Sequence, residues 1–315
     1  MKPLRVVFFG TPEFAKTCLK AIHESHHEVV GVVTVADKAS GRGQKINQSA
    51  VKIYAVDQGL TVLQPEKLRN PEFLEAVKSL EADVFVVVAF RMMPKILFEM
   101  PRLGTFNLHA SLLPDYRGAA PINYALINGE TKTGATTFFI NEKIDEGNIL
   151  LQEELPIAPD ETAGELHDRL MEMGAGLIVK TLDGLAENTI EEKPQPSVAE
   201  PKNAFKIFKE DTRISWAQTG QIIHNFIRGL SPYPCAFTTL LIGGEEKSLK
   251  FYKGRFTTGS ESVPGQLDIN KNEFKIHTAD GFYFPEELQL EGKKRMNIKD
   301  FLNGFRSFEE ISLKN

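Results

Sequence analysis

An amide and an imidazole lie two positions apart at Asn107 and His109 in this 315-residue sequence. If the surrounding residues 105–109 form a strand, its two-residue period places both side chains on one face. An amide N–H can stabilise a developing oxyanion, and an imidazole can move a proton near neutral pH. The pair is therefore a candidate catalytic site, although a single histidine after a strand is more often packed or solvated than catalytic.

An acidic turn further along the chain offers a third group. It reads Asp145-Glu146-Gly147. A carboxylate beside His109 would orient the imidazole, favour its protonated form and accept a proton through water. Aspartate near glycine is also a common turn former. The sequence alone does not bring Asp145 close to His109.

The elements that must position these groups are typical of an α/β fold. Leu4–Phe9 and Val29–Thr34 are buried-strand patterns, and Phe14, Cys18 and Ile22 between them follow helical spacing. This strand–helix–strand order predicts a Rossmann-like domain with parallel strands. The fingerprint GxGxxG is missing after the first strand, which argues against NAD binding.

Later patterns divide the chain. Thr162 and Glu165 form a capping-box pattern that predicts a long helix at the end of the first domain. The proline-rich, charged segment 191–201 predicts an extended linker. Beyond it, short apolar runs such as Thr238–Ile242 alternate with glycines, as in a small β-barrel. We predict a first domain over 1–189, a linker over 190–205 and a second domain over 206–315.

Composition narrows the class of protein. Hydrophobic residues make up 42% of the chain, enough for a sizeable core. Two distant cysteines, Cys18 and Cys235, imply neither a disulfide framework nor a cysteine-rich zinc site. No run approaches the roughly 20 apolar residues of a membrane span, so we expect a soluble, cytoplasmic protein. The net charge of −5 argues against wholesale wrapping of nucleic acid.

Three motifs together resemble a known family. They are Asn107–Pro121, which reads NLHASLLPDYRGAAP, the later Ile144–Gly147, and Gly10–Phe14. Motifs of this kind are found in formyltransferases that use 10-formyltetrahydrofolate. The resemblance covers nearly the whole chain and is greatest to the members that act on methionyl-tRNA. It implies a Rossmann-like formyltransferase domain followed by a small OB-like β-barrel domain that binds tRNA.

The resemblance implies a reaction and roles for the three candidate groups. A formyl group would pass from 10-formyltetrahydrofolate to the α-amino group of methionyl initiator tRNA, for translation initiation. Asn107 would stabilise the tetrahedral oxyanion, because its amide donates and does not titrate. His109 would donate to the oxyanion or relay a proton, and Asp145 would orient His109. No metal is expected.

Two further stretches are expected to hold the folate. The loop after the strand at residues 83–89 departs from the family pattern, because Arg91 stands where a glycine is usual and the segment is one residue shorter. The other stretch is the turn after His109. The folate contacts implied by the resemblance are Phe90, Arg91, Met92, Ser111, Leu112, Leu113 and Pro114.

The segment Asp37–Lys45 combines glycines with basic residues, a composition typical of a solvated surface loop. In the tRNA enzymes of the family, this loop enters the acceptor-stem region. The resemblance therefore implies phosphate contacts for Lys38 and Lys45, and base contacts for Arg42. Initiator methionyl-tRNA is the partner implied, with no membrane and no obligate protein partner.

Three alternatives stay open. A sugar-nucleotide formyltransferase would use the same catalytic groups with another acceptor, and a formyl-folate hydrolase would use water. An RNA-binding module without activity belongs to a different class. The basic loop and the Arg228–Pro234 motif favour tRNA as acceptor. The intact set of Asn107, His109 and Asp145 argues against a module without activity.

Overall fold

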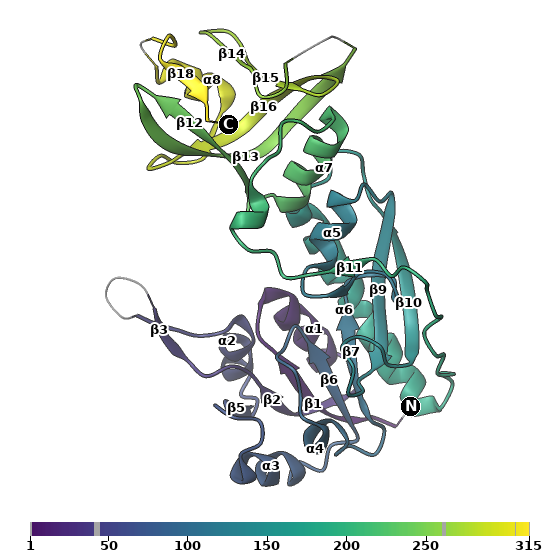
Figure 1. Cartoon of the computed structure of the whole chain (residues 1–315). Helices are drawn as coiled ribbons and strands as arrows, with labels where there is room; N and C mark the ends of the chain where they lie inside the picture. Colours follow the sequence, from purple (N-terminus) through teal and green to yellow (C-terminus); the bar gives the residue numbers. More distant parts are fainter. Residues whose placement is uncertain (1, 41–44, 260–262, 306, 315) are drawn as a thin grey trace. The chain divides into compact units, whose positions relative to one another are not determined.

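The computed structural model describes residues 2–40, 45–259, 263–305 and 307–314 (Figure 1). Its contacts divide the chain into two compact units. Unit 1 consists of residues 1–118, 133–156 and 168–203, and unit 2 consists of residues 119–132, 157–167 and 204–315. Each unit therefore contains residues that precede 189, and neither unit is a single continuous stretch of the sequence.

Unit 1 contains a seven-stranded sheet with the strand order β10-β9-β7-β6-β1-β2-β5. Strands β2, β1, β6 and β7 pair in parallel, and β9 runs antiparallel to β7. The strands are β1 (Arg5–Gly10), β2 (Glu28–Val33), β5 (Val62–Leu63), β6 (Val84–Val88), β7 (Thr105–His109), β9 (Lys132–Phe139) and β10 (Ile149–Pro156). The central strands are continuously apolar because helices cover parallel sheets on both faces. This arrangement confirms the Rossmann-like prediction.

Short helices and a hairpin connect the strands of unit 1. Strands β3 (Lys38–Ser40) and β4 (Lys45–Asn47) form an antiparallel pair, and β8 covers Arg117–Gly118. Helix α1 has its buried side at Phe14, Cys18 and Ile22, as the spacing predicts. The helices are α1 (Glu13–His23), α2 (Ala50–Asp57), α3 (Pro71–Lys78), α4 (Lys95–Phe98) and α6 (Ala163–Glu187), whose first residues, 163–167, belong to unit 2.

Unit 2 contains an antiparallel sheet with the strand order β14-β15-β16-β13-β12-β18, and β17 pairs with β16. The end strands β14 and β18 contact each other, so the sheet curls toward a barrel. This fold confirms the prediction of a second, barrel-like domain. Its strands are β12 (Ala236–Ile242), β13 (Glu245–Thr258), β14 (Leu267–Ile269), β15 (Phe274–Thr278), β16 (Gly281–Leu290), β17 (Met296–Asn297) and β18 (Ile311–Leu313). A further short strand, β11 (Asn203–Ala204), pairs with β8 and is not part of this sheet.

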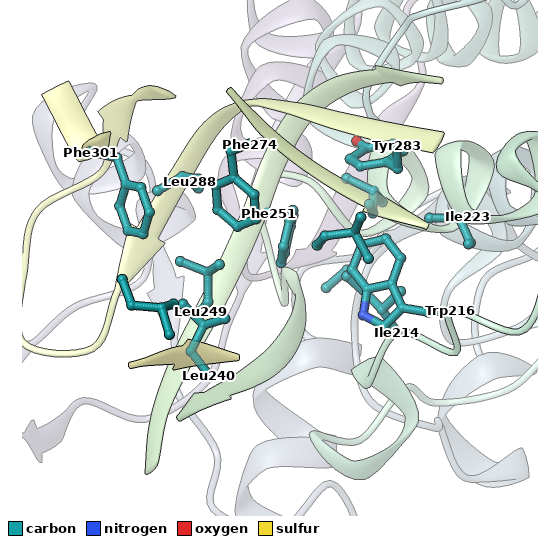
Figure 2. Packing of buried hydrophobic residues seen from close by; sticks show 14 of the residues in the cluster. Ile214, Trp216, Ile223, Leu240, Leu249, Phe251, Phe274, Tyr283, Leu288 and Phe301 are labelled. Carbon is teal, nitrogen blue, oxygen red and sulfur yellow. The ribbon is translucent and has the colours of Figure 1, made fainter. Parts of the chain in front are cut away.

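Aromatic rings fill the barrel of unit 2 (Figure 2). The ring centroid of Trp216 lies 5.6 Å from that of Phe251 and 6.0 Å from that of Tyr283. Such edge and tilted contacts stabilise a core beyond the area that they bury. The helices of this unit are α5 (Pro121–Ile127), α7 (Gly220–Leu230), α8 (Ile298–Asn303) and the 3-10 turn η1 (Glu210–Thr212). No helix in the described ranges is long and apolar enough to cross a bilayer.

The predicted capping box begins α6. The Thr162 hydroxyl accepts a hydrogen bond from the N–H of Glu165 at 3.3 Å, and the Glu165 carboxylate accepts from the N–H of Thr162 at 2.8 Å. The carboxylate also pairs with Lys253 at 3.0 Å. The hydrogen bonds from Thr162, followed by Lys253, lower the pKa of Glu165 to about 2. Each partner is in unit 2.

Glu165→Gln should destabilise unit 2 at neutral pH by about 1 kcal/mol or less, because the carboxylate is half exposed. A carboxylate whose pKa is lower in the folded state stabilises above its unfolded pKa, near 4.5, and loses this effect as pH falls toward about 2. The difference from wild type should therefore shrink on acidification. Urea unfolding followed by the fluorescence of Trp216, the sole tryptophan, measures it. The exposed Glu200→Gln is the matched control, and an equal effect in both variants would contradict the cap.

Candidate active site

Strand β7 presents Asn107 and His109 on the same face of the sheet of unit 1. Asn107 lies opposite Val87 of β6 and Phe138 of β9, so the middle of the strand is held on both sides. Asn107 is half-buried, and His109 is buried. Within the described ranges, no hydrogen bond engages the Asn107 side chain. Its amide is therefore available to donate to a bound group.

A backbone carbonyl fixes the tautomer of His109. The Nε2 atom lies 2.8 Å from the carbonyl oxygen of Tyr116. Since a carbonyl can only accept, Nε2 carries the hydrogen and Nδ1 is the acceptor in the neutral ring. Nδ1 lies 3.8 Å from Oδ2 of Asp145. A proton taken up on Nδ1 would thus face the carboxylate.

Asp145 lies in the loop between β9 and β10, which folds back to the His109 side chain. Its Oδ2 atom accepts a hydrogen bond from the N–H of Gly118 at 2.9 Å. The side chain is 15% exposed, so the carboxylate is only partly solvated. The structure therefore brings His109 and Asp145 together, which the sequence alone could not do.

Among the described residues of unit 1, five that are not glycine adopt left-handed backbone conformations, and three of them lie in the loops after β6, β7 and β9. The φ angles are +47° at Ala89, +61° at Tyr116 and +53° at Asp145. Ala89 follows β6, Tyr116 supplies the carbonyl for His109, and Asp145 supplies the carboxylate. Such conformations cost about 1–3 kcal/mol each and persist where the surroundings hold them. They gather at functional sites more often than elsewhere, which supports a built site here.

Arg91 anchors, through hydrogen bonds, the loop after β6 that is expected to hold the folate. Its guanidinium donates to the carbonyl of Glu66 at 2.8 Å and to the carbonyl of Pro65, and it also lies over the Phe90 ring. The Phe90 ring packs edge-on against Phe9. Arg91 therefore holds this loop in place. Met92 is 69% exposed. Folate contact by Phe90, Arg91 and Met92 stays a prediction.

Buried side chains hold the turn after β7, residues 111–114, in place. The Ser111 hydroxyl is buried and donates to the carbonyl of Asp115 at 2.6 Å. Leu113 is buried against Phe138 and Ile149. These two side chains shape the turn, and Leu112 and Pro114 are more accessible. A folate contact by any of the four is likewise untested and stays a prediction.

The basic loop is only partly described. The backbone of Lys38 pairs with that of Asn47, and Ser40 with Lys45. Arg42 lies outside the described residues, as do the side chains of Lys38 and Lys45. At the base of this hairpin, the Asp37 carboxylate accepts from Lys52 and from Gln64, at 2.5 and 2.8 Å. These hydrogen bonds, the one from Lys52 first, lower the pKa of Asp37.

One trio of possible metal ligands occurs in the described part of the chain, at His26, His27 and Asp183. The Nδ1 atom of His27 accepts a hydrogen bond from the N–H of Leu4 at 3.2 Å. Nε2 of His27 therefore carries the hydrogen, and it points at Asp183 at 3.1 Å. A metal would need the unprotonated nitrogen there. This geometry favours a hydrogen-bonded pair, and burial lowers the pKa of His27.

Sequence reasoning missed two residues that contact the Asp145 loop. Gln195 lies in the segment predicted as a linker, and its amide donates to the carbonyl of Asp145 at 2.7 Å. Arg117, which lies within the motif Asn107–Pro121, donates to Gln195 and pairs with Glu146 at 3.4 Å. The contacts of Gln195 with the loop go to backbone carbonyls, which have no signature in the sequence.

Comparisons with known proteins agree on a family. The formyl transferase pattern matches residues 4–182, and that of the formyl transferase C-terminal domain matches residues 206–306. The chain is 50% identical to a methionyl-tRNA formyltransferase of Flavobacterium johnsoniae, over 99% of this chain and 100% of that protein. It is 49% identical to a methionyl-tRNA formyltransferase of Parabacteroides distasonis, over 98% of each chain.

Solved structures are similar in fold. An N-formyltransferase of Helicobacter canadensis, in complex with folinic acid and dTDP-3-aminofucose, gives a TM-score of 0.67 at 22% identity, over 93% of this chain and 100% of that one. HypX of Aquifex aeolicus, in complex with tetrahydrofolic acid, gives 0.64 at 16% identity, over 100% of this chain and 51% of that one. At these identities the likeness establishes the fold alone.

Proposed function

Because this chain belongs to the formyl transferase family, we propose that it transfers a formyl group from 10-formyltetrahydrofolate to the α-amino group of methionyl initiator tRNA. The observation that carries the proposal is the grouping of Asn107, His109 and Asp145 in a chain that matches relatives of this activity from end to end. A product of this kind serves translation initiation.

The protein must stabilise an oxyanion and assist two proton transfers in this reaction. The methionine amine attacks the formyl carbon and creates a tetrahedral oxyanion, the amine loses a proton, and the bond from carbon to N10 breaks as N10 gains a proton. The Asn107 amide, which no hydrogen bond engages within the described part of the chain, donates to the oxyanion. His109 receives or donates the proton at Nδ1, and the Tyr116 carbonyl keeps the ring in place. Asp145 stabilises the protonated ring.

The N-terminal and C-terminal parts of the chain would have different functions, catalysis and tRNA binding. Residues 1–189 would carry the chemistry and the folate, residues 190–205 would connect, and residues 206–315 would bind the tRNA. Support for this division comes from the separate matches of the two family patterns. In the folate-binding part, the accessible groups are Met92, Leu112 and Pro114 together with the loop that Arg91 fastens. No membrane or protein partner enters this proposal.

A transfer assay tests the acceptor. Wild-type protein is supplied with 10-formyltetrahydrofolate and either initiator or elongator methionyl-tRNA, and formylmethionine is quantified after deacylation. We expect product on the initiator alone. Arg42→Ala should raise the KM for tRNA by about tenfold, the effect of losing one good base contact, and the exposed Arg69→Ala serves as the surface-arginine control.

Other outcomes separate the alternatives. Consumption of formyl-folate with product on neither tRNA would overturn tRNA as the acceptor. Amino-sugar nucleotides and water would then be assayed in turn. Equal losses in Arg42→Ala and Arg69→Ala would contradict the role of the basic loop but leave the acceptor in place.

A further inference from the structure

Gln195 uses its whole side-chain amide within unit 1. Its Nε2 atom donates to the carbonyl oxygens of Asp145 and Gly147 at 2.7 and 2.9 Å. Its Oε1 atom accepts from Nη2 and Nε of Arg117 at 2.6 and 3.1 Å. Two donated and two accepted hydrogen bonds satisfy the side chain fully. One residue therefore joins the loop of Asp145 to the loop of Arg117.

Both loops supply groups to His109. Arg117 lies between Tyr116, whose carbonyl accepts from His109, and Gly118, whose N–H donates to Asp145. Arg117 also pairs with Glu146 at 3.4 Å, directly beside Asp145 in the chain. The brace formed by Gln195 and Arg117 thus connects the backbone segments on either side of the imidazole.

Backbone pairing places Gln195 at this point. Lys193 and Ile149 exchange two backbone hydrogen bonds, at 2.7 and 2.9 Å, where β10 begins. The Asn148 amide donates to Glu192 at 3.0 Å. The segment is extended, as its prolines predict, but it is bound to the sheet rather than free. Its attachment fixes where the Gln195 side chain reaches.

The Asp145 loop needs such support. Asp145 has a φ of +53°, a left-handed backbone conformation that persists in a residue other than glycine where its surroundings hold it. The two bonds from Gln195 engage the carbonyls of Asp145 itself and of Gly147. At Gly147 a side chain would collide with the carbonyl oxygen of Phe139, so the loop lies directly on the sheet. Two hydrogen bonds and this close packing fix the carboxylate.

We propose that Gln195, supported by Arg117, is a positioning residue for the formyl transfer, an inference that rests on the proposed function. Without its two donated bonds, the Asp145 loop relaxes and the carboxylate leaves its place beside His109. Misplacement of a reacting group by about 1 Å can lower a rate about 10²-fold. Substrate binding surfaces stay as they are, so the effect falls on kcat rather than on KM.

The test compares Gln195→Ala and Gln195→Glu with wild type and with Gln58→Ala, an exposed glutamine of the same unit. Gln195→Glu keeps the length and an acceptor for Arg117 but loses both donors to the Asp145 loop. We expect kcat to fall about 10- to 100-fold in both Gln195 variants, with each KM within about threefold of wild type. The melting temperature and the circular dichroism spectrum report whether the fold is retained.

A double-variant cycle with Arg117→Ala supplies a second readout. Because both residues act through one connection, the loss of kcat in Gln195→Ala/Arg117→Ala should be clearly smaller than the product of the single losses. Wild-type rates within about twofold in Gln195→Glu, or losses confined to KM or to melting temperature, would overturn the proposal. The wild-type arm identifies the reaction itself, so a failure of the proposed function is seen separately from a failure of the brace.

Discussion

Asn107→Ala should lower kcat for formyl transfer about 10²–10³-fold, the usual loss when one oxyanion donor is removed. The side chain lies in mid-strand between Val87 and Phe138, and no hydrogen bond within the described ranges competes for its amide. A half-buried donor that no other described residue engages is ready for charge that develops only during the reaction. The KM for each substrate should change little, since ground-state contacts lie elsewhere.

Single-turnover rates with saturating substrates measure this effect directly. Asn107→Asp is the informative companion, because it keeps the shape of the side chain, removes the donor and adds negative charge next to the expected oxyanion. We expect Asp to be at least as inactive as Ala. A rate within about threefold of wild type in either variant would contradict the oxyanion assignment.

The second large effect is expected at His109. His109→Gln should lower kcat about 10²–10⁴-fold, the range for removal of a proton-transfer group. Glutamine can still donate to the Tyr116 carbonyl, which in His109→Ala loses its buried partner. The Ala variant should therefore lose a similar rate but melt at a lower temperature than the Gln variant.

This pair of variants separates chemistry from packing. Steady-state kinetics give kcat, and calorimetry gives the melting temperature of each variant. If Gln restored most of the activity lost in Ala, His109 would serve mainly to hold Tyr116 and its loop, and its role in proton transfer would be refuted. Equal melting temperatures would mean that the Tyr116 contact adds little stability.

Regular structure around the site could be predicted because side-chain periodicity expresses it. The two-residue spacing of Asn107 and His109 was enough to place both on one face of a strand, and capping residues were enough to start α6. Both depend on local sequence, where the alternation of side chains and the capping chemistry are set.

Non-local contacts could not be predicted in the same way. The approach of Asp145 to His109 depends on a loop that folds back from β9, with a left-handed backbone conformation at Asp145. Gln195 lies in a proline-rich, charged stretch whose composition indicates a linker. Its contacts with the Asp145 loop go to backbone carbonyls, which any residue offers, so composition gives no sign of them.

Residues of a single sequence motif also differ in how deeply they are buried. The turn Ser111–Pro114 is one continuous motif in the sequence. In the structure, Ser111 and Leu113 are buried, while Leu112 and Pro114 are more accessible. Variation at the inward positions should act through the shape of the turn. The sequence could not show this division, because it arises from packing against Phe138 and Ile149.

The most direct test of the central claim follows the formyl carbon itself. Wild-type protein is mixed with 10-formyltetrahydrofolate labelled in the formyl carbon and with methionyl initiator tRNA under single-turnover conditions. The label is then divided between formylmethionyl-tRNA and free formate. We predict that nearly all of the label that leaves the folate appears as the amide on methionine, and that the Asn107→Ala and His109→Gln proteins leave it on the folate. Release of the label as formate, with none on the tRNA, would contradict the account.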